Sequence, residues 1–136
     1  RIRADHADVP NGHAFVAGET VAESIVLAKR AGNRLFHMHF NDNHGSWDDD
    51  MIVGSVHTVR YLEILYWLDR TGYDGWLSMD QYPYREDAAG AIGESILWLE
   101  RFGQIVAAHR AEIDALIGAD DAVRTSRFLR QALLER

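Results

Sequence analysis

The sequence predicts an α/β fold in which parallel strands are covered by helices. Two short segments with a two-residue alternation, 35–41 and 76–80, are separated by a helical segment and followed by another. Strand, helix and strand at this spacing form a βαβ unit, whose two strands run parallel. A third observation supports this fold: both strands carry polar residues at their carboxyl ends, where parallel α/β proteins gather their functional groups.

The composition describes a chain with the size of one ordinary domain. Its 136 residues are 47% hydrophobic, which is enough to bury a core. The formal net charge of -7 and the single lysine argue against nucleic acid or an anionic membrane surface as a partner. No stretch approaches the roughly 18 consecutive apolar residues of a membrane-spanning helix. We expect a soluble protein, and its start at Arg1 without a methionine is compatible with a truncated chain.

The first expected helix runs from Thr20 to Ala31. Thr20 and Glu23 have the spacing of a capping box, and Gly32 stands where the helix would end. The strand Leu35–Asn41 follows, and its alternation separates an apolar face from a polar one. The apolar face carries Phe36, Met38 and Phe40, and the polar face carries His37, His39 and Asn41.

A polar loop, residues 41–50, comes next, and its length favours a functional role. Ser55 is placed to cap a helix from about Val56 to Arg70, and Gly72 ends that helix. The second strand is Trp76–Asp80. The remaining elements are a helix from about Ala88 to His109 and an amphipathic tail over 111–136 that is interrupted around 118–121.

Histidine and aspartate residues stand where the two strands end. His39 and Asp80 occupy this place on consecutive strands, so their side chains are expected to converge at one edge of the sheet. The loop between them adds Asp48, Asp49 and Asp50. The alternate members Asp48 and Asp50 can point at one cation if the loop is extended. Carboxylates and imidazoles in a chain without cysteine suit Mn2+, Mg2+ or Co2+.

Each of these residues also has an ordinary structural interpretation. An aspartate run in a glycine-containing loop is usually a solvated turn. Asp80, at the end of its strand, can simply begin a turn. His37 lies deeper in its strand than His39 and is better explained as a hydrogen-bonded structural histidine. The alternation over 76–80 also fits a half-exposed antiparallel strand.

Three motifs together resemble a known superfamily. They are HFNDNHGSWDDDMIVG at 39–54, WLSMDQ at 76–81 and GHAFVAGETVAES at 12–24. This combination resembles the C-terminal part of the xylose-isomerase-like TIM barrels, the sugar isomerases and epimerases, and is most similar to the L-rhamnose isomerase branch. The resemblance implies the C-terminal portion of a (β/α)8 barrel, its last two or three βα units, followed by a helical tail.

The resemblance also implies ligands for two metal ions and a reaction. His39 and Asp80 match a histidine and an acid that bind the principal metal. His13, Asp48 and Asp50 match ligands of a second metal. The implied cofactor is Mn2+, with Mg2+ or Co2+ as alternatives, and the implied substrate is a small sugar converted between aldose and ketose. Asp80 is then the candidate catalytic residue that assists hydrogen transfer between adjacent carbons.

Other functions remain open. A sugar 3-epimerase of the same superfamily would be expected to end its last strand in Glu rather than Asp80. A metal-dependent endonuclease on a related barrel is disfavoured by the acidic charge. A non-catalytic half-barrel relic is supported by Pro10, which stands where the family usually has an Asp ligand. Asp8 replaces that ligand only if the segment is rearranged, and the loop after His39 is one residue longer than in the rhamnose isomerase branch.

The length sets the expected domain organisation. A complete barrel takes about 250 residues, so residues 1–110 are expected to form its C-terminal part and 111–136 a helical extension. The resemblance implies a bridging Glu metal ligand upstream of Arg1. For the 136 residues alone we expect weak metal binding and no turnover. The full-length enzyme is expected to be a cytoplasmic homo-oligomer.

Overall fold

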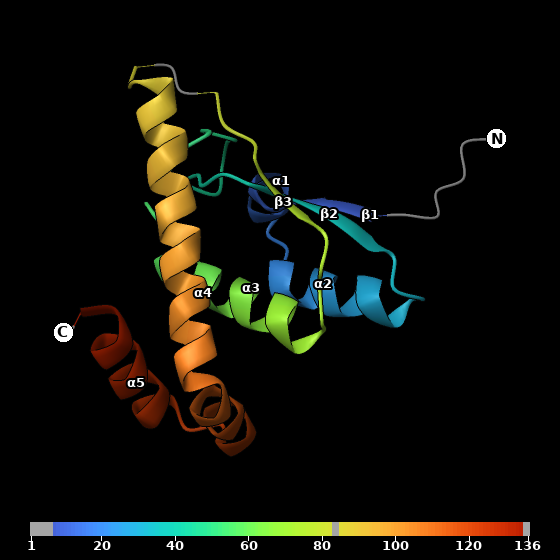
Figure 1. The fold of residues 1–136 in the computed structure, drawn as a ribbon, viewed down its shortest axis with the longest axis vertical. Coiled ribbons are helices and arrows are strands. Elements are labelled where there is room, and N and C mark those ends of the chain that lie inside the picture. Colours follow the sequence, from blue (N-terminus) through green and yellow to red (C-terminus); the bar gives the residue numbers. More distant parts are fainter. Residues whose placement is uncertain (1–6, 83–84, 135–136) are drawn as a thin grey trace.

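The computed structural model describes residues 7–82 and 85–134. Its sheet has three parallel strands in the order β1 (Ala7–Pro10), β2 (Leu35–Phe40) and β3 (Trp76–Met79), as Figure 1 shows. In the register of the sheet, His39 on β2 lies opposite Pro10 on β1 and Ser78 on β3. The parallel α/β prediction is therefore confirmed, and the alternative of an antiparallel strand at 76–80 is wrong.

Helices follow each strand. They are α1 (Asn11–Val16), α2 (Val21–Arg30), α3 (Thr58–Arg70), α4 (Ala88–Ala119) and α5 (Ala122–Leu134). In Figure 1, α2 and α3 lie along one face of the sheet, and α4 runs past its end to meet α5. The backbone of α4 leaves helical geometry at His109, and Asp120 adopts a left-handed conformation before α5 begins. The predicted interruption of the tail is thus present.

Two helix starts differ from the expectation. The side chain of Thr20 makes no capping hydrogen bond to α2, so the predicted capping box does not form. Ser55 does not cap α3 either, because its hydroxyl donates to the carbonyl of Ile52 at 2.6 Å. The helix begins at Thr58 instead, and its first turn is preceded by backbone N–H groups that donate to a distant aspartate, Asp42.

The core lies between the sheet and the helices. Met38 and Phe40 of β2 are fully buried, together with Ile25 of α2 and Ile64 of α3. Phe102 of α4 extends the same core beyond the end of the sheet. Because successive strand residues point to opposite faces, burial of Met38 and Phe40 places the histidines of β2 on the face away from this core.

That second sheet face and the β3 edge are open within residues 7–82 and 85–134. Trp76 is 74% exposed and Leu77 is 41% exposed, although both belong to a strand. Parallel strands of a complete barrel are normally covered on both faces. Three parallel strands with helices after them are consistent with part of a barrel, and the described residues contain no closed barrel.

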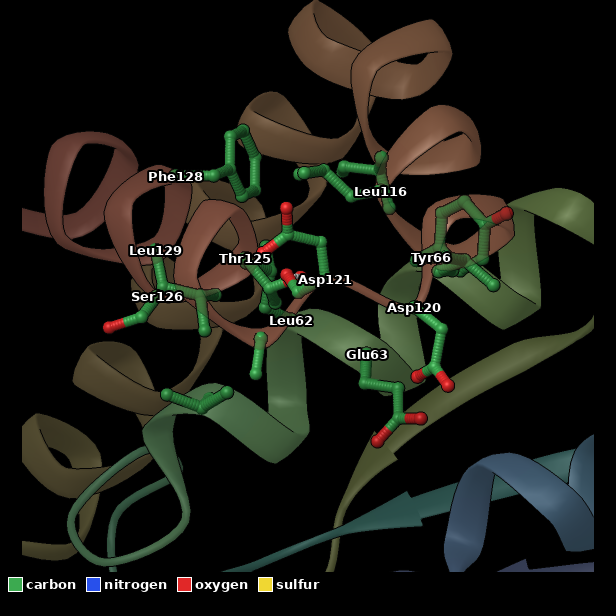
Figure 2. A pocket seen from close by; sticks show the side chains of 14 residues that line it. Leu62, Glu63, Tyr66, Leu116, Asp120, Asp121, Thr125, Ser126, Phe128 and Leu129 are labelled. Atoms are coloured by element: carbon green, nitrogen blue, oxygen red, sulfur yellow. Dashed lines mark hydrogen bonds between the residues drawn. The ribbon is translucent and has the colours of Figure 1, made fainter.

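A cavity lies among the C-terminal helices, away from the strand ends. It has a volume of about 620 Å3 and is lined by residues of α3, α4, α5 and the turn before α5. Figure 2 shows apolar side chains such as Leu62, Leu116 and Phe128 around it, with the carboxylates of Glu63 and Asp120 beside them. None of the predicted metal ligands lines this cavity. Over the described part of the chain, the helices are too short or too polar to cross a membrane.

Candidate metal centre

The pair His39 and Asp80 forms at the carboxyl ends of β2 and β3. The Nδ1 atom of His39 lies 3.6 Å from Oδ2 of Asp80. The two strands bring them together because the backbone N–H of Asp80 donates to the carbonyl of Phe40, which continues the ladder past the end of β3. The side chain of Asp80 is 50% exposed and that of His39 is 32% exposed, so a small ligand can reach both.

The loop after β2 is closed at its base by Asp42. Asp42 and Met51 exchange two backbone hydrogen bonds, which form an isolated antiparallel bridge. The fully buried carboxylate of Asp42 accepts from the backbone N–H groups of Val56 and His57 at 2.8 and 3.0 Å, and from Nδ1 of His57 at 2.7 Å. This carboxylate therefore joins the loop to the start of α3, where the helix dipole favours a negative charge.

Inside this loop the side-chain amide of Asn41 brings two aspartates together. Its Nδ2 donates to Oδ1 of Asp48 at 2.7 Å and to Oδ1 of Asp50 at 2.8 Å. The second oxygen of Asp48 lies 3.0 Å from Nε2 of His13, which follows β1. Asp49 instead accepts from the backbone N–H of His44. Asp48 and Asp50 thus both face the amide of Asn41, although the loop is not extended at Asp50, where φ is 51°.

A buried network fixes the end of β2 behind these ligands. Nδ2 of Asn11 donates to the carbonyl of Asn41 at 2.9 Å and to the hydroxyl of Tyr61 at 2.7 Å. The Tyr61 hydroxyl also donates to the carbonyl of Asn41. Nδ2 of Asn43 donates to the carbonyl of Gly12 at 2.8 Å. Satisfied buried polar groups of this kind give a segment one conformation, because any displacement leaves a donor or acceptor without a partner.

Burial, together with the neighbouring carboxylates, raises the pKa of Asp50. Burial of the carboxyl group raises the pKa above its ordinary value of 3.8, and the negative charges of Asp48 and Asp80 raise it further. Hydrogen bonds from Asn41 and from the backbone N–H of Tyr82 lower the pKa of Asp50 but do not cancel these effects. The influence of Asp80 also shows that the loop carboxylates and the strand-end pair share one electrostatic environment.

A test of this environment is the substitution Asp50→Asn. In the folded protein Asp50 binds its proton more readily than in the unfolded chain, so its contribution to stability increases as the pH falls through the raised pKa, down to about pH 4. Asn removes the charge and tolerates the positive φ of 51° at this position. We therefore expect Asp50→Asn to raise the Tm at pH 7 and to reduce the dependence of urea unfolding on pH.

The same substitution at Asp49, in the same loop, is the matched control for that experiment. Asp49→Asn keeps the loop length and the change of charge while leaving the Asn41 contacts intact. A lower Tm for Asp50→Asn at pH 7, or a pH dependence equal to that of the wild type, would contradict a raised pKa of Asp50 in the folded protein.

The side chains of this site are of the types that bind divalent metals, but in the described part of the chain too few of them lie together to hold an ion. Carboxylate oxygens and imidazole nitrogens suit Mn2+ or Mg2+, and two pairs stand at contact distance, His13 with Asp48 and His39 with Asp80. Across residues 7–82 and 85–134, no three His, Asp or Glu side chains are grouped so that they could hold one ion. These residues can therefore supply part of a coordination sphere, which water, a substrate or further ligands would complete.

Several residues of the site are not recognisable from sequence reasoning. The residues Asn11, Asn41 and Asn43 lie inside or next to the motifs. Asn11 and Asn43 have hydrogen-bond partners that are 30 or more residues away in the sequence. Asp42 looks like one more polar loop residue, although it is fully buried. The available signal is the density of amides and acids directly after an aromatic strand, since such residues are rarely buried unless they are hydrogen-bonded.

Two comparisons relate this chain to known proteins. The chain is 32% identical over 75 residues to an uncharacterized protein, MJ1311, of Methanocaldococcus jannaschii. The matched region is 55% of this chain and 25% of the relative, so the chain spans about a quarter of that protein. A family model described as xylose isomerase-like TIM barrel matches residues 9–102, which include the end of β1, all of β2 and β3, and all five predicted ligands. The chain therefore belongs to the xylose isomerase-like TIM barrel family.

Proposed function

We propose that this chain is part of a divalent-metal-dependent sugar isomerase that interconverts an aldose and a ketose. The observation that carries the proposal is the pair His39 and Asp80, held 3.6 Å apart at the ends of neighbouring parallel strands. Active sites of parallel α/β barrels lie at this edge of the sheet. Membership of the xylose isomerase-like family supports sugar chemistry, and the L-rhamnose isomerase branch is our finer proposal within it.

The proposed cofactor is Mn2+, with Mg2+ or Co2+ as alternatives. His39 and Asp80 would contribute ligands to the principal ion, while His13, Asp48 and Asp50 would contribute ligands to a second. Because no three of these side chains are grouped around one point in the described residues, further ligands would have to complete both sites. A bound divalent ion supplies Lewis acidity, which polarises the carbonyl of an open-chain sugar.

The chain itself contributes binding and proton handling. Asp80 is half exposed, so its carboxylate is accessible to a sugar and is our proposed group for carrying a proton between adjacent carbons.

The side-chain amide of the next residue, Gln81, is a second candidate for a contact in the complete site. Among the residues that the structure describes, both polar atoms of this side chain are buried without a hydrogen-bond partner. Because buried amides are nearly always hydrogen-bonded, we expect this amide to bond to substrate or to further protein in the complete site.

Isothermal titration of Mn2+ tests the metal site in this chain. We expect weak binding by the wild type and a smaller heat from the Asp48→Ala, Asp50→Ala double variant, which keeps only the His39 and Asp80 pair of the principal ion. The variant Glu94→Ala, Glu100→Ala is the charge-matched control, because it removes two exposed acids of α4. Equal heats from wild type and the loop variant would remove Asp48 and Asp50 from the site.

Nuclear magnetic resonance of the intact gene product tests the reaction. With Mn2+ and a panel of aldoses in D2O, we expect ketose formation that depends on Asp80. Deuterium at the carbon next to the carbonyl indicates proton transfer, and its absence indicates a hydride shift. In the same experiment on ketoses, deuterium exchange confined to C3 without aldose–ketose conversion would identify a 3-epimerase instead. Metal binding without conversion of any sugar would exclude the isomerase.

A non-catalytic barrel is the second candidate, and Pro10 is the observation that favours it. The resemblance expects an Asp ligand at this position, and β1 places Pro10 directly opposite His39 in the sheet register. A carboxylate is therefore missing beside the principal pair. If the metal residues are relics, the site should not respond when this carboxylate is restored.

The substitution Pro10→Asp is expected to raise the affinity for Mn2+ by about tenfold, since it adds an anionic ligand next to His39. The backbone accepts the change, because Pro10 is the N-cap of α1 and Asp is a favoured N-cap residue. Pro10→Asn keeps the cap and lacks the charge, so it should leave Mn2+ affinity near that of the wild type. Titration heats that do not distinguish the two variants would favour the relic.

Three further features of the whole protein stay proposals. We propose that a small sugar is its partner, that it forms homo-oligomers, and that it works in the cytoplasm. The formal net charge of -7 supports the absence of a nucleic-acid or anionic-membrane partner.

A further inference from the structure

The cavity among the C-terminal helices lies largely outside the region that matches the family model. The match ends at residue 102, whereas α4 and α5 contribute lining residues between positions 113 and 129. None of the proposed metal ligands lines the cavity, so a ligand bound there would be separate from the metal centre. Its volume of about 620 Å3 is within the range of about 300–1,000 Å3 that small-molecule sites occupy.

The hollow forms because α5 presents small side chains to it. Ala122, Thr125 and Ser126 line the cavity from the first two turns of α5, and none of these side chains is large enough to fill it. Among the described residues of α5, only Phe128 is buried, so the helix is held against the core mainly beyond these turns. Protein interiors contain few voids larger than a water molecule. An apolar hollow of this size therefore indicates a place for a ligand.

The base of the cavity is apolar. Leu62 and Tyr66 of α3 and Ile113 and Leu116 of α4 line it, and all four side chains are buried. The hydroxyl of Tyr66 is already engaged, because it donates to Oδ1 of Asp114 at 2.6 Å. This base favours the aliphatic or aromatic part of a ligand, since apolar surface gains free energy when it leaves water.

Two carboxylates stand at the exposed side of the same cavity. Glu63 of α3 and Asp120 of the turn before α5 line the cavity and are exposed, and Figure 2 shows both turned to the same side. Within residues 7–82 and 85–134, neither carboxylate has a hydrogen bond or an ion pair. The third acid of the lining, Asp121, is engaged, because its Oδ1 accepts the backbone N–H groups of Val123 and Arg124.

Neighbouring arginines leave the charge of these two acids uncompensated. Three arginines of α3 and α4 stand near lining residues in the sequence, and each contacts another group. They are Arg60 with the ring of Phe15, Arg70 with Asp114, and Arg110 with Asp69. The arginines of α5 do not line the cavity. Negative charge beside an apolar base complements a ligand that carries a positive group on an apolar body.

We propose that this cavity binds a small amphipathic cation, in which an aliphatic or aromatic body carries one ammonium group. The body occupies the apolar base between α3 and α4, and the ammonium group lies beside the carboxylates of Glu63 and Asp120. The site shares no residue with the proposed metal centre, so failure of either one leaves the other unaffected.

Binding of n-octylammonium, n-octanol and octanoate to the metal-free chain tests the proposal, with each compound kept dissolved as a monomer. Shift changes in 1H–15N NMR spectra locate each compound and give its affinity. We expect octylammonium to bind about three- to tenfold more tightly than octanol, which is the effect of two exposed charge pairs, and octanoate to bind least. Added NaCl should reduce this preference, because it screens exposed charges.

Two kinds of variant separate the charge from the cavity. Glu63→Gln, Asp120→Asn removes both carboxylates, and Asn tolerates the positive φ of 49° at position 120. This double variant should bind octylammonium and octanol equally. The charge-matched control is Glu94→Gln, Glu100→Gln, at two exposed acids of α4 outside the cavity lining. Ser126→Trp adds a large ring to the cavity wall and should weaken binding of all three compounds.

Several outcomes would overturn the proposal. They are equal affinities of the wild type for octylammonium and octanol, no binding by the folded wild type, and shift changes confined to the open sheet face around Trp76 and Leu77. Sedimentation velocity examines a different occupant. A dimer that Ser126→Trp converts to a monomer would assign the cavity to a second copy of this chain and would also overturn the proposal. Circular dichroism shows whether each variant is folded.

Discussion

Replacing Asp42 with alanine is expected to reduce the free energy of unfolding by about 3–5 kcal/mol, which is the range for breaking a buried ionic or charge-assisted network. The carboxylate is fully buried and accepts four hydrogen bonds, from the backbone of Asn43, Val56 and His57 and from the ring of His57. Alanine leaves these buried and partly buried donors without their acceptor, and a donor that loses its acceptor away from water carries a desolvation penalty.

The same change should also weaken Mn2+ binding, because Asp42 closes the base of the loop that presents Asp48 and Asp50. Urea unfolding followed by circular dichroism measures the loss of stability. Asp49→Ala is the matched control, because Asp49 is an acid of the same loop that accepts only the backbone N–H of His44 in the described contacts. This variant should lose at most about 1 kcal/mol of the free energy of unfolding. Similar unfolding midpoints for the two variants would show that the Asp42 network contributes little.

Replacing Gly12 with alanine is expected to lower Mn2+ affinity by tenfold or more, in the range of about 10–100-fold for disturbed ligand support. A methyl group on Gly12 would stand 2.6 Å from Oδ1 of Asp48 and closer still to Oδ1 of Asn41. Something must move, and the side chains in the way are those that bring Asp48 and Asp50 together. The glycine is therefore required by close approach of ligand side chains rather than by an unusual backbone angle.

Stability should fall as well, by about 1–3 kcal/mol, because overpacking forces neighbouring groups from their preferred positions. Gly103→Ala is the opposite case. Gly103 lies inside α4 with no atom near the position of the added methyl group, so the variant should gain about 0.5–1 kcal/mol from helix propensity. A Gly12→Ala protein with wild-type titration heats would mean that the Asn41 contacts do not shape the site.

The candidate site divides into residues that the sequence predicts and residues that it does not. His39, Asp80, Asp48 and Asp50 stand out because strand ends and an extended loop have simple periodicities, and the structure brings them into two neighbouring groups. Asn41 connects two of them through an amide whose orientation no local pattern predicts. His37 is expected as a hydrogen-bonded histidine, and its partners prove to be Ser78 and His39.

Helix starts show the same division. Thr20 and Ser55 have the residue type and spacing of caps, yet neither side chain caps its helix. The start of α3 is determined by Asp42, which is 14 residues from Val56 and reaches it only because the loop folds back. A capping motif depends only on residues within a few positions of the helix start. At α3, the buried carboxylate of Asp42 from another segment accepts the N–H hydrogen bonds instead.

The amino-acid sequence by itself predicted the α/β class, the strands β2 and β3 with the helices that follow them, and the candidate metal ligands, because periodicity and residue chemistry act over short distances along the chain. Only the tertiary structure decided which of those side chains meet. His13 contacts Asp48, which is 35 positions away in the sequence. The contacts of Ser78 with His37 and of His37 with His39 join β3 to β2. Such contacts depend on strand register and loop closure, which are set by burial of the whole core rather than by any local pattern.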